Sequence, residues 1–284
     1  MPKLTYGLIG HPVGHSLSPA MQNAAFDDLK IDAEYKLFDI EPAGLEKFLK
    51  DLVKNNIAGV NVTIPHKVKA KDFIKANGVL NEHAERLGAV NTIKVVGGKL
   101  MGFNTDGPGF YRSLVEDLKF EPEGKSVFVL GAGGAARAIV MYLGNGPREI
   151  FVTDIDDRMV EDLKKHFEKY YDHRRFKAVC KNNFKESLDA SDLLVQATPI
   201  GMHDGDPSPV DPKLLHPGLR VYDLVYNRPA TKLVEEATRM KLHAMTGLGM
   251  LLCQGAIAFE LWTAKRAPIE VMRKALKEAL KSHG

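Results

Sequence analysis

The chain of 284 residues is long enough for two domains. Its hydrophobic content of 44% and charged content of 26% are ordinary for a soluble globular protein, and a net charge of only +3 without any Lys/Arg block gives no reason to expect nucleic acid as a partner. Two cysteines are too few for a disulfide framework, and the first residues lack a long apolar signal core, so we expect a cytoplasmic protein. The longest apolar run, 247–262, is too short to span a bilayer and predicts a buried helix instead of a membrane anchor.

Strands and helices alternate through the first hundred residues. The expected strands are 4–10, 33–40 and 59–64, with helices at 20–29 and 44–54 between them. Ser18 is expected as the N-cap of the first helix, with Pro19 as its first residue. Short helical segments follow between 66 and 87, and 90–96 with 100–103 suggest a hairpin across Gly97-Gly98. This alternation predicts a mainly parallel sheet.

The stretch SVFVLGAGGAA at 126–136 predicts a dinucleotide-binding site. Four apolar residues lead into Gly131-Ala132-Gly133-Gly134-Ala135-Ala136, the pattern of a strand, a glycine turn and the first turn of a helix. Glycine lets the backbone bend sharply and approach a pyrophosphate, which the N–H groups of the helix start then hold. A second strand, 149–153, ends in Asp154, where an acidic residue binds the ribose 2′-OH. The alternative is a glycine-rich turn that binds nothing.

The second half continues the alternation. Helices are expected at 107–118, 135–143, 158–170 and 230–240, strands at 192–197 and 220–225, and two closing helices at 249–264 and 268–282. We therefore predict an α/β protein of two domains with the active site in the cleft. The N-terminal substrate-binding domain comprises residues 1–105 plus 247–284, and a Rossmann dinucleotide-binding domain comprises residues 106–246.

Polar side chains recur at expected strand ends in the half without the nucleotide motif, namely Ser16 and Ser18 in HSLSP, Asn61, Thr63 and Lys67 in NVTIPHK, Asn91 in AVNT, and Asn104 and Asp106 in GFNTDG. Ligands of open α/β sheets bind at the carboxyl ends of strands. Simpler explanations exist, since Ser18 and Asp106 could be helix N-caps and Lys67 a solvated charge. Together, however, a lysine, an aspartate, amides and hydroxyls suit a polyhydroxylated, carboxylated small molecule.

Eight motifs in this order and spacing resemble the shikimate dehydrogenase family, including its quinate/shikimate dehydrogenase relatives, over essentially the whole chain. They are HSLSP, NVTIPHK, AVNT, NTDG, GAGGAA, ATPIGM, DLVYN and GLGMLLCQGA. The resemblance implies reversible NAD(P)-dependent interconversion of 3-dehydroshikimate and shikimate, a step of aromatic amino acid biosynthesis. It also implies that Lys67 and Asp106 form the catalytic pair that handles the proton of the alcohol.

The same resemblance implies the binding residues. Ser16 and Ser18 would bind the substrate carboxylate, Thr63, Asn91 and Gln254 its carboxylate or ring hydroxyls, and Tyr226 would lie over the substrate pocket. The cofactor would contact Gly131, Ala132, Gly133, Gly134, Ala135, Asp154, Arg158, Thr198 and, near the nicotinamide, Gly249.

The segment after the second Rossmann strand departs from the pattern of NADP-dependent members, which typically carry an Asn-Arg-Thr-like sequence there. This chain has Asp154-Ile155-Asp156-Asp157-Arg158. Asp154 can accept from the ribose 2′-OH, and three carboxylates repel a phosphate. We therefore predict a preference for NAD, with Arg158 as the residue that leaves NADP possible.

Other functions stay open at this point. A quinate-preferring dehydrogenase is the alternative within the enzyme class, and a catalytically silent nucleotide-binding sensor is the alternative outside it, although the presence of both Lys67 and Asp106 argues against the sensor. His11, His15 and His66 are too loosely spaced for metal ligands, so no metal is expected. Both a monomer and a homodimer are compatible with the sequence.

Overall fold

The computed structural model describes residues 3–283, which divide into two compact α/β units. The first unit comprises Met1–Asp106 and Leu252–Gly284, and the second comprises Gly107–Leu251. The chain therefore leaves the first unit once, builds the whole of the second, and returns to the first.

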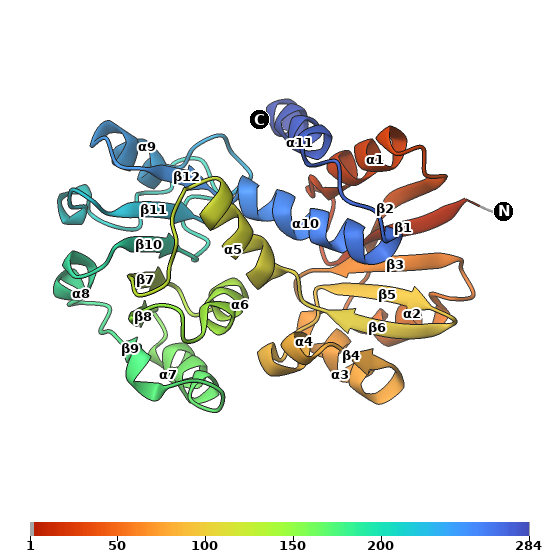
Figure 1. Ribbon diagram of the computed structural model, residues 1–284, viewed down its shortest axis with the longest axis horizontal. Coiled ribbons are helices and arrows are strands. Elements are labelled where there is room, and N and C mark those ends of the chain that lie inside the picture. Colours follow the sequence, from red (N-terminus) through yellow and green to blue (C-terminus); the bar gives the residue numbers. More distant parts are fainter. Residues whose placement is uncertain (1–2, 284) are drawn as a thin grey trace. The chain divides into compact units, whose positions relative to one another are not determined.

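A six-stranded mixed sheet forms the centre of the first unit, in the order β2-β1-β3-β5-β6-β4 (Figure 1). The strands are β1 (Leu4–Gly10), β2 (Ala33–Asp39), β3 (Ile57–Val62), β4 (Val79–Leu80), β5 (Thr92–Val96) and β6 (Lys99–Phe103). β1 pairs in parallel with β2 and β3, whereas β5 runs antiparallel to β3 and forms a hairpin with β6. The parallel part brings the carboxyl ends of β1, β2 and β3 to one edge of the sheet.

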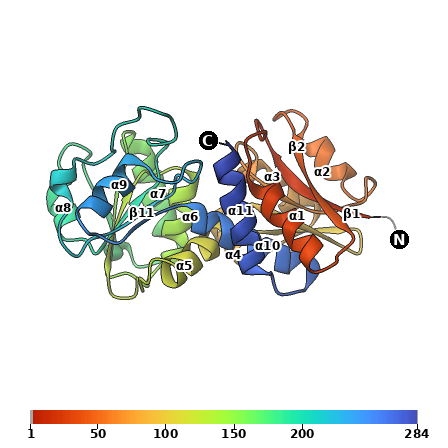
Figure 2. The same ribbon diagram turned by 90° about the horizontal axis from the view of Figure 1, so that it is seen from above.

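The helices of the first unit are α1 (Ser18–Asp28), α2 (Leu45–Asp51), α3 (Lys67–Asn77), α4 (Glu82–Leu87), most of α10 (Leu248–Thr263) and α11 (Ile269–His283). α11 lies beside α1, which Figures 1 and 2 both show. Trp262 of α10 donates from Nε1 to the carbonyl of Ile93 at 3.0 Å. Gly59 makes this approach possible, because a Cβ there would stand 2.4 Å from the indole nitrogen. The last helices are thus part of the first unit's core.

All strand pairs of the second unit are parallel, in the order β12-β11-β10-β7-β8-β9. The strands are β7 (Ser126–Leu130), β8 (Glu149–Thr153), β9 (Phe176–Ala178), β10 (Leu193–Gln196), β11 (Arg220–Asp223) and β12 (Ala244–Thr246). The helices are α5 (Asp106–Glu116), α6 (Gly134–Leu143), α7 (Asp157–Phe167), α8 (Lys185–Asp189) and α9 (Lys232–Arg239), with short 3₁₀ turns η1 (His173–Arg175) and η2 (Pro212–Leu214). The chain order reverses between β7 and β10, and this is the switch point at which doubly wound folds bind nucleotides.

The α/β class and the mainly parallel sheets agree with the prediction from sequence, while several details differ. The short strands β4, β9 and β12 and the helix α8 were not expected. Ser18 is not the N-cap of α1 but its first residue, and Leu17 precedes it without a side-chain cap. Among the described residues, no helix is long and apolar enough to cross a bilayer.

Candidate active site

Lys67 and Asp106 form an ion pair in the first unit. Lys67 is the first residue of α3, and its Nζ donates to Asp106 Oδ2 at 2.6 Å. The two side chains are only 26% and 12% exposed. Asp106 stands in the first turn of α5, where the helix dipole favours a carboxylate. A cation and an anion are therefore held together at a partly dry position, as a proton-transfer pair requires.

The amide of Asn91 joins this pair to further predicted residues. Its Nδ2 donates to Asp106 Oδ1 at 2.8 Å and to Thr105 Oγ1 at 3.0 Å. Thr105 Oγ1 in turn lies 3.5 Å from Gln254 Oε1 of α10. The structure thus gathers Lys67, Asp106, Asn91 and Gln254 into one cluster within the first unit.

The two serines of HSLSP lie next to each other after β1. Ser16 Oγ accepts a hydrogen bond from the Ser18 backbone N–H at 3.2 Å, and Ser18 itself is only 5% exposed. Thr63 follows β3, and its N–H donates to the carbonyl of Ile9 at the end of β1. Ser18 also hydrogen-bonds to Tyr35, a buried tyrosine of β2 whose pKa is raised by burial and lowered in part by that bond. These hydroxyls belong to the same sheet edge as the Lys67–Asp106 cluster.

The glycine turn between β7 and α6 leaves room for a phosphate group. Gly131 has a φ of +109°, and a Cβ there would stand 2.9 Å from the carbonyl oxygen of Ala197. At Gly133 and Gly134 a Cβ would meet nothing within 4 Å, and no side chain caps the start of α6. Uncapped N–H groups at a helix start, with open space in front of them, fit a dinucleotide pyrophosphate.

The other residues that were predicted to bind the cofactor here lie within the glycine turn or next to it. Ala132 donates its N–H to Asp154, Ala135 is exposed at the start of α6, and the methyl group of Thr198 would lie 3.2 Å from a Cβ at Gly131. The turn, the end of β8 and the segment after β10 therefore meet at the switch point.

The end of β8 carries both anions and cations. Asp154 accepts from Ala132 N at 2.7 Å through Oδ2 and from Asp156 N at 3.0 Å through Oδ1. Arg158 donates through Nε and Nη2 to Asp156, a bond that holds the pKa of this carboxyl below its usual range. The Arg158 side chain is nevertheless 88% exposed. Lys181, from the segment after β9, donates from Nζ to the carbonyl of Ile155 at 2.6 Å.

Tyr226 and Gly249 belong to the second unit. Tyr226 is 38% exposed. Gly249 lies on α10, where a Cβ would stand 2.2 Å from Ser113 Oγ, so close helix packing alone requires glycine there. Asp223, at the end of β11, is fully buried, and it accepts from Thr231 Oγ1 at 2.7 Å and Val225 N at 3.0 Å. Burial raises the pKa of Asp223 to about 6.

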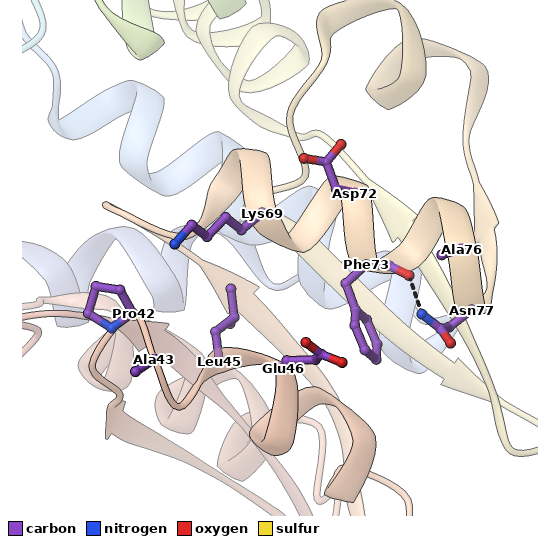
Figure 3. A pocket seen from close by; sticks show the side chains of 9 residues that line it. All are labelled: Pro42, Ala43, Leu45, Glu46, Lys69, Asp72, Phe73, Ala76 and Asn77. Atoms are coloured by element: carbon purple, nitrogen blue, oxygen red, sulfur yellow. Dashed lines mark hydrogen bonds between the residues drawn. The ribbon is translucent and has the colours of Figure 1, made fainter.

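A separate hollow of about 420 Å³ lies between α2 and α3 (Figure 3). It is lined by Pro42, Ala43, Leu45, Glu46, Lys69, Asp72, Phe73, Ala76 and Asn77. Its polar side chains pair locally, as Asn77 does with the carbonyl of Phe73 at 2.9 Å and Glu46 with Lys50 at 2.6 Å. None of the predicted site residues lines this hollow, so it is not the candidate active site.

Four residues of the candidate site were not predicted individually. Thr92, whose Oγ1 donates to Asn91 Oδ1 at 3.0 Å, lies inside the AVNT motif, and Thr105 lies inside the NTDG motif, so a signal for both was present. Tyr35 and Lys181 lie outside every motif, and their places become visible only through the contacts of the folded chain.

Comparisons with known proteins show the family to which the chain belongs. Residues 8–93 match the family model of the shikimate dehydrogenase substrate binding domain, and residues 247–277 match that of the shikimate 5′-dehydrogenase C-terminal domain. A shikimate dehydrogenase (NADP⁺) of Methanopyrus kandleri is 45% identical over 97% of this chain and 95% of its own length.

Solved structures are similar as well. A shikimate dehydrogenase in complex with NADP⁺ has a TM-score of 0.89 and 37% identity, covering 98% of this chain and 96% of its own. The shikimate 5-dehydrogenase of Thermus thermophilus in complex with NADP(H) and shikimate has a TM-score of 0.86 and 35% identity, covering 97% and 99%.

The predicted preference for NAD is wrong, because these relatives are named for NADP⁺ or bind NADP. The structure supplies the physical reason. Both carboxylate oxygens of Asp154 already accept backbone N–H groups, and Arg158 neutralises Asp156, so the segment repels a phosphate less than its acidic sequence suggested. The quinate and sensor alternatives are not favoured either.

Proposed function

Because the chain belongs to the shikimate dehydrogenase family, we propose that it interconverts shikimate and 3-dehydroshikimate with NADP as the hydride carrier. The observation that carries this proposal is the 2.6 Å ion pair between Lys67 and Asp106 among hydroxyl and amide side chains at one sheet edge. Hydride transfer from an alcohol needs a group that takes the hydroxyl proton, and this pair can provide it.

The substrate carboxylate binds at Ser16 and Ser18, which present two neighbouring hydroxyl groups after β1. The ring hydroxyls bind to three further side chains. Thr63 follows the end of β3, Asn91 precedes the start of β5, and Gln254 lies on α10. Neutral donors and acceptors of this kind recognise hydroxyls with direction, and the cation of Lys67 adds attraction for an anionic acid.

In shikimate oxidation, Lys67 acts as the neutral amine, after one proton has left its ammonium group: Nζ takes the proton of the hydroxyl group while the carbinol carbon is oxidised to a carbonyl. Asp106 holds the resulting ammonium in place and stabilises its charge. NADP⁺, when bound, accepts the hydride from that carbon. In the reverse direction Lys67 returns the proton to the carbonyl oxygen.

The glycine turn holds the cofactor. The N–H groups of Gly133, Gly134 and Ala135 face the pyrophosphate at the uncapped start of α6. Arg158 and Lys181 provide cations for the 2′-phosphate, because both are exposed at the end of β8 and each is held by only a surface contact. Thr198, Tyr226 and Gly249 keep the contacts that the family resemblance implies.

The exposed thiol of Cys180 suits a reducing cytoplasm.

Reduced-cofactor formation, followed by near-ultraviolet absorbance with shikimate and NADP⁺, tests the proposal. Lys67→Ala should lower kcat on the order of a hundredfold or more without changing the affinity for NADP⁺. Lys69→Ala, an exposed lysine of the same helix, is the matched control and should keep wild-type turnover. Wild-type turnover in Lys67→Ala, or no turnover of shikimate by the wild type, would refute the assignment.

A further inference from the structure

Five buried side chains of the first unit form a continuous series of hydrogen bonds that ends on the Asp106 carboxylate. The bonds run from Tyr35 Oη to Asn61 Oδ1 (2.8 Å), from Asn61 Nδ2 to Thr92 Oγ1 (3.0 Å), from Thr92 Oγ1 to Asn91 Oδ1 (3.0 Å) and from Asn91 Nδ2 to Asp106 Oδ1 (2.8 Å). Each of the five residues is at most 8% exposed. We call this series the buried polar network.

The donors of the buried polar network all point the same way. An ionised carboxylate only accepts, so Asn91 must present Nδ2 to Asp106 and Oδ1 to the other side. The backbone N–H of Thr105, which only donates, meets that Oδ1 at 2.7 Å and fixes the same orientation independently. Likewise Asn61 Nδ2 faces the carbonyl of Asn91 at 3.3 Å, so its Oδ1 must accept from Tyr35.

This alignment has an electrostatic consequence. Hydrogen bonds that share one direction polarise one another, and the effect is strongest where water is excluded. The hydroxyl of Tyr35 keeps its proton, because burial raises the pKa of this tyrosine. Its position is fixed by Asn23, whose side chain bonds the Tyr35 backbone N–H at 2.8 Å and carbonyl at 3.1 Å. A rigid neutral donor therefore stands at the far end of the network.

We propose that Tyr35 and Thr92 are positioning residues for the reaction, which act through Asn61 and Asn91 to hold the Asp106 carboxylate in the orientation that faces Lys67. This inference rests on the proposed catalytic role of Lys67 and Asp106. According to this proposal, β2, which is far from Lys67 and Asp106 in the sequence, helps to hold the geometry of their ion pair. The network ends on the Asp106 carboxylate, so we expect its main effect on turnover, with a smaller effect on substrate binding through Asn91 and through Ser18, which hydrogen-bonds to Tyr35.

Four single variants test the proposal by steady-state kinetics with shikimate and NADP⁺. Tyr35→Phe and Thr92→Val each remove one hydroxyl at nearly constant volume, and each should lower kcat roughly three- to tenfold, which is a larger factor than the accompanying change in KM for shikimate. Thr92→Ser keeps the hydroxyl and should restore turnover. Tyr6→Phe is the matched control, since Tyr6 pairs with Tyr35 across β1 and β2, is only 4% exposed and also contacts Trp262.

The double variant Tyr35→Phe/Thr92→Val separates a connected network from two independent sites. Its kcat should match that of the slower single variant, because a break at Thr92 already disconnects Tyr35. Losses that multiply, or a Tyr35→Phe kcat equal to that of Tyr6→Phe, would overturn the inference. The urea unfolding midpoints of the same variants should be non-additive too, and this readout needs no substrate. Failure of the proposed function would instead appear as an inactive wild type with this coupling intact.

Discussion

Asp223 makes the stability of the second unit depend on pH in the mildly acidic range. Burial raises the pKa of its carboxyl from an ordinary value of 3.8 to about 6. The folded state therefore binds the proton more tightly than the unfolded state, so the stabilising contribution of the protonated group is complete below about pH 3.8 and is lost as pH rises toward about 6. The full difference corresponds to about 3 kcal/mol.

Asp223→Asn resembles the protonated side chain at every pH. Its Oδ1 can still accept from Val225 N, and its Nδ2 can face Thr231 Oγ1. We expect the variant to gain stability over the wild type by about 1.4 kcal/mol when pH is raised from about 5 to about 7.5, from the same two pKa values.

Urea unfolding followed by circular dichroism at the two pH values measures this gain. Trp262, the single tryptophan, lies in the first unit, so its fluorescence reports that unit separately. Asp211→Asn, an exposed carboxylate that caps η2 in the same unit, gives the background pH dependence. A stability difference between wild type and Asp223→Asn that does not change with pH would show that the reasoning is wrong.

The nucleotide site gives two further predictions. Arg158→Ala should weaken NADP⁺ binding about tenfold or more and NAD⁺ binding less than about threefold in fluorescence titrations, with Lys181→Ala acting in the same direction. Arg174→Ala is the control: it removes a similar arginine that donates to Asp172, and it should leave the affinities for NADP⁺ and NAD⁺ unchanged. Equal losses of affinity for the two cofactors in Arg158→Ala would contradict the assignment. Gly131→Ala should cost about 1–3 kcal/mol of unfolding free energy and weaken NADP⁺ binding, because of its positive φ and the Ala197 carbonyl. An unchanged urea midpoint would argue against this.

The alternation of long strands and helices was readable from the sequence because each is set by local apolar periodicity and turn residues. β8 has the predicted bounds, and the predicted hairpin is formed by β5 and β6. β4, β9 and β12 have two or three residues each and are strands only because a neighbouring strand pairs with them. A periodicity of that length carries no signal.

The residues of the Lys67–Asp106 ion pair were predictable from motifs, whereas the residues that support the pair were not. Lys67, Asn91 and Asp106 stand in short segments that identify the family. Tyr35 stands in an ordinary β2 sequence, and its link to Asn61 arises from strand pairing across β1. The error over NAD has a related cause, since the charge of Asp154 was counted without the backbone N–H groups that its carboxylate accepts.

The return of α10 and α11 to the first unit has a consequence during synthesis. Because Trp262 contacts Ile93 and α11 lies beside α1, the first unit cannot complete its core until almost the whole chain has left the ribosome. The second unit is contiguous and needs no later segment. Folding during translation usually proceeds from the N-terminal domain onward. Here we expect the second unit, with its glycine turn, to fold first. The first unit, which contains Lys67, can fold completely only after α10 and α11 have been synthesised.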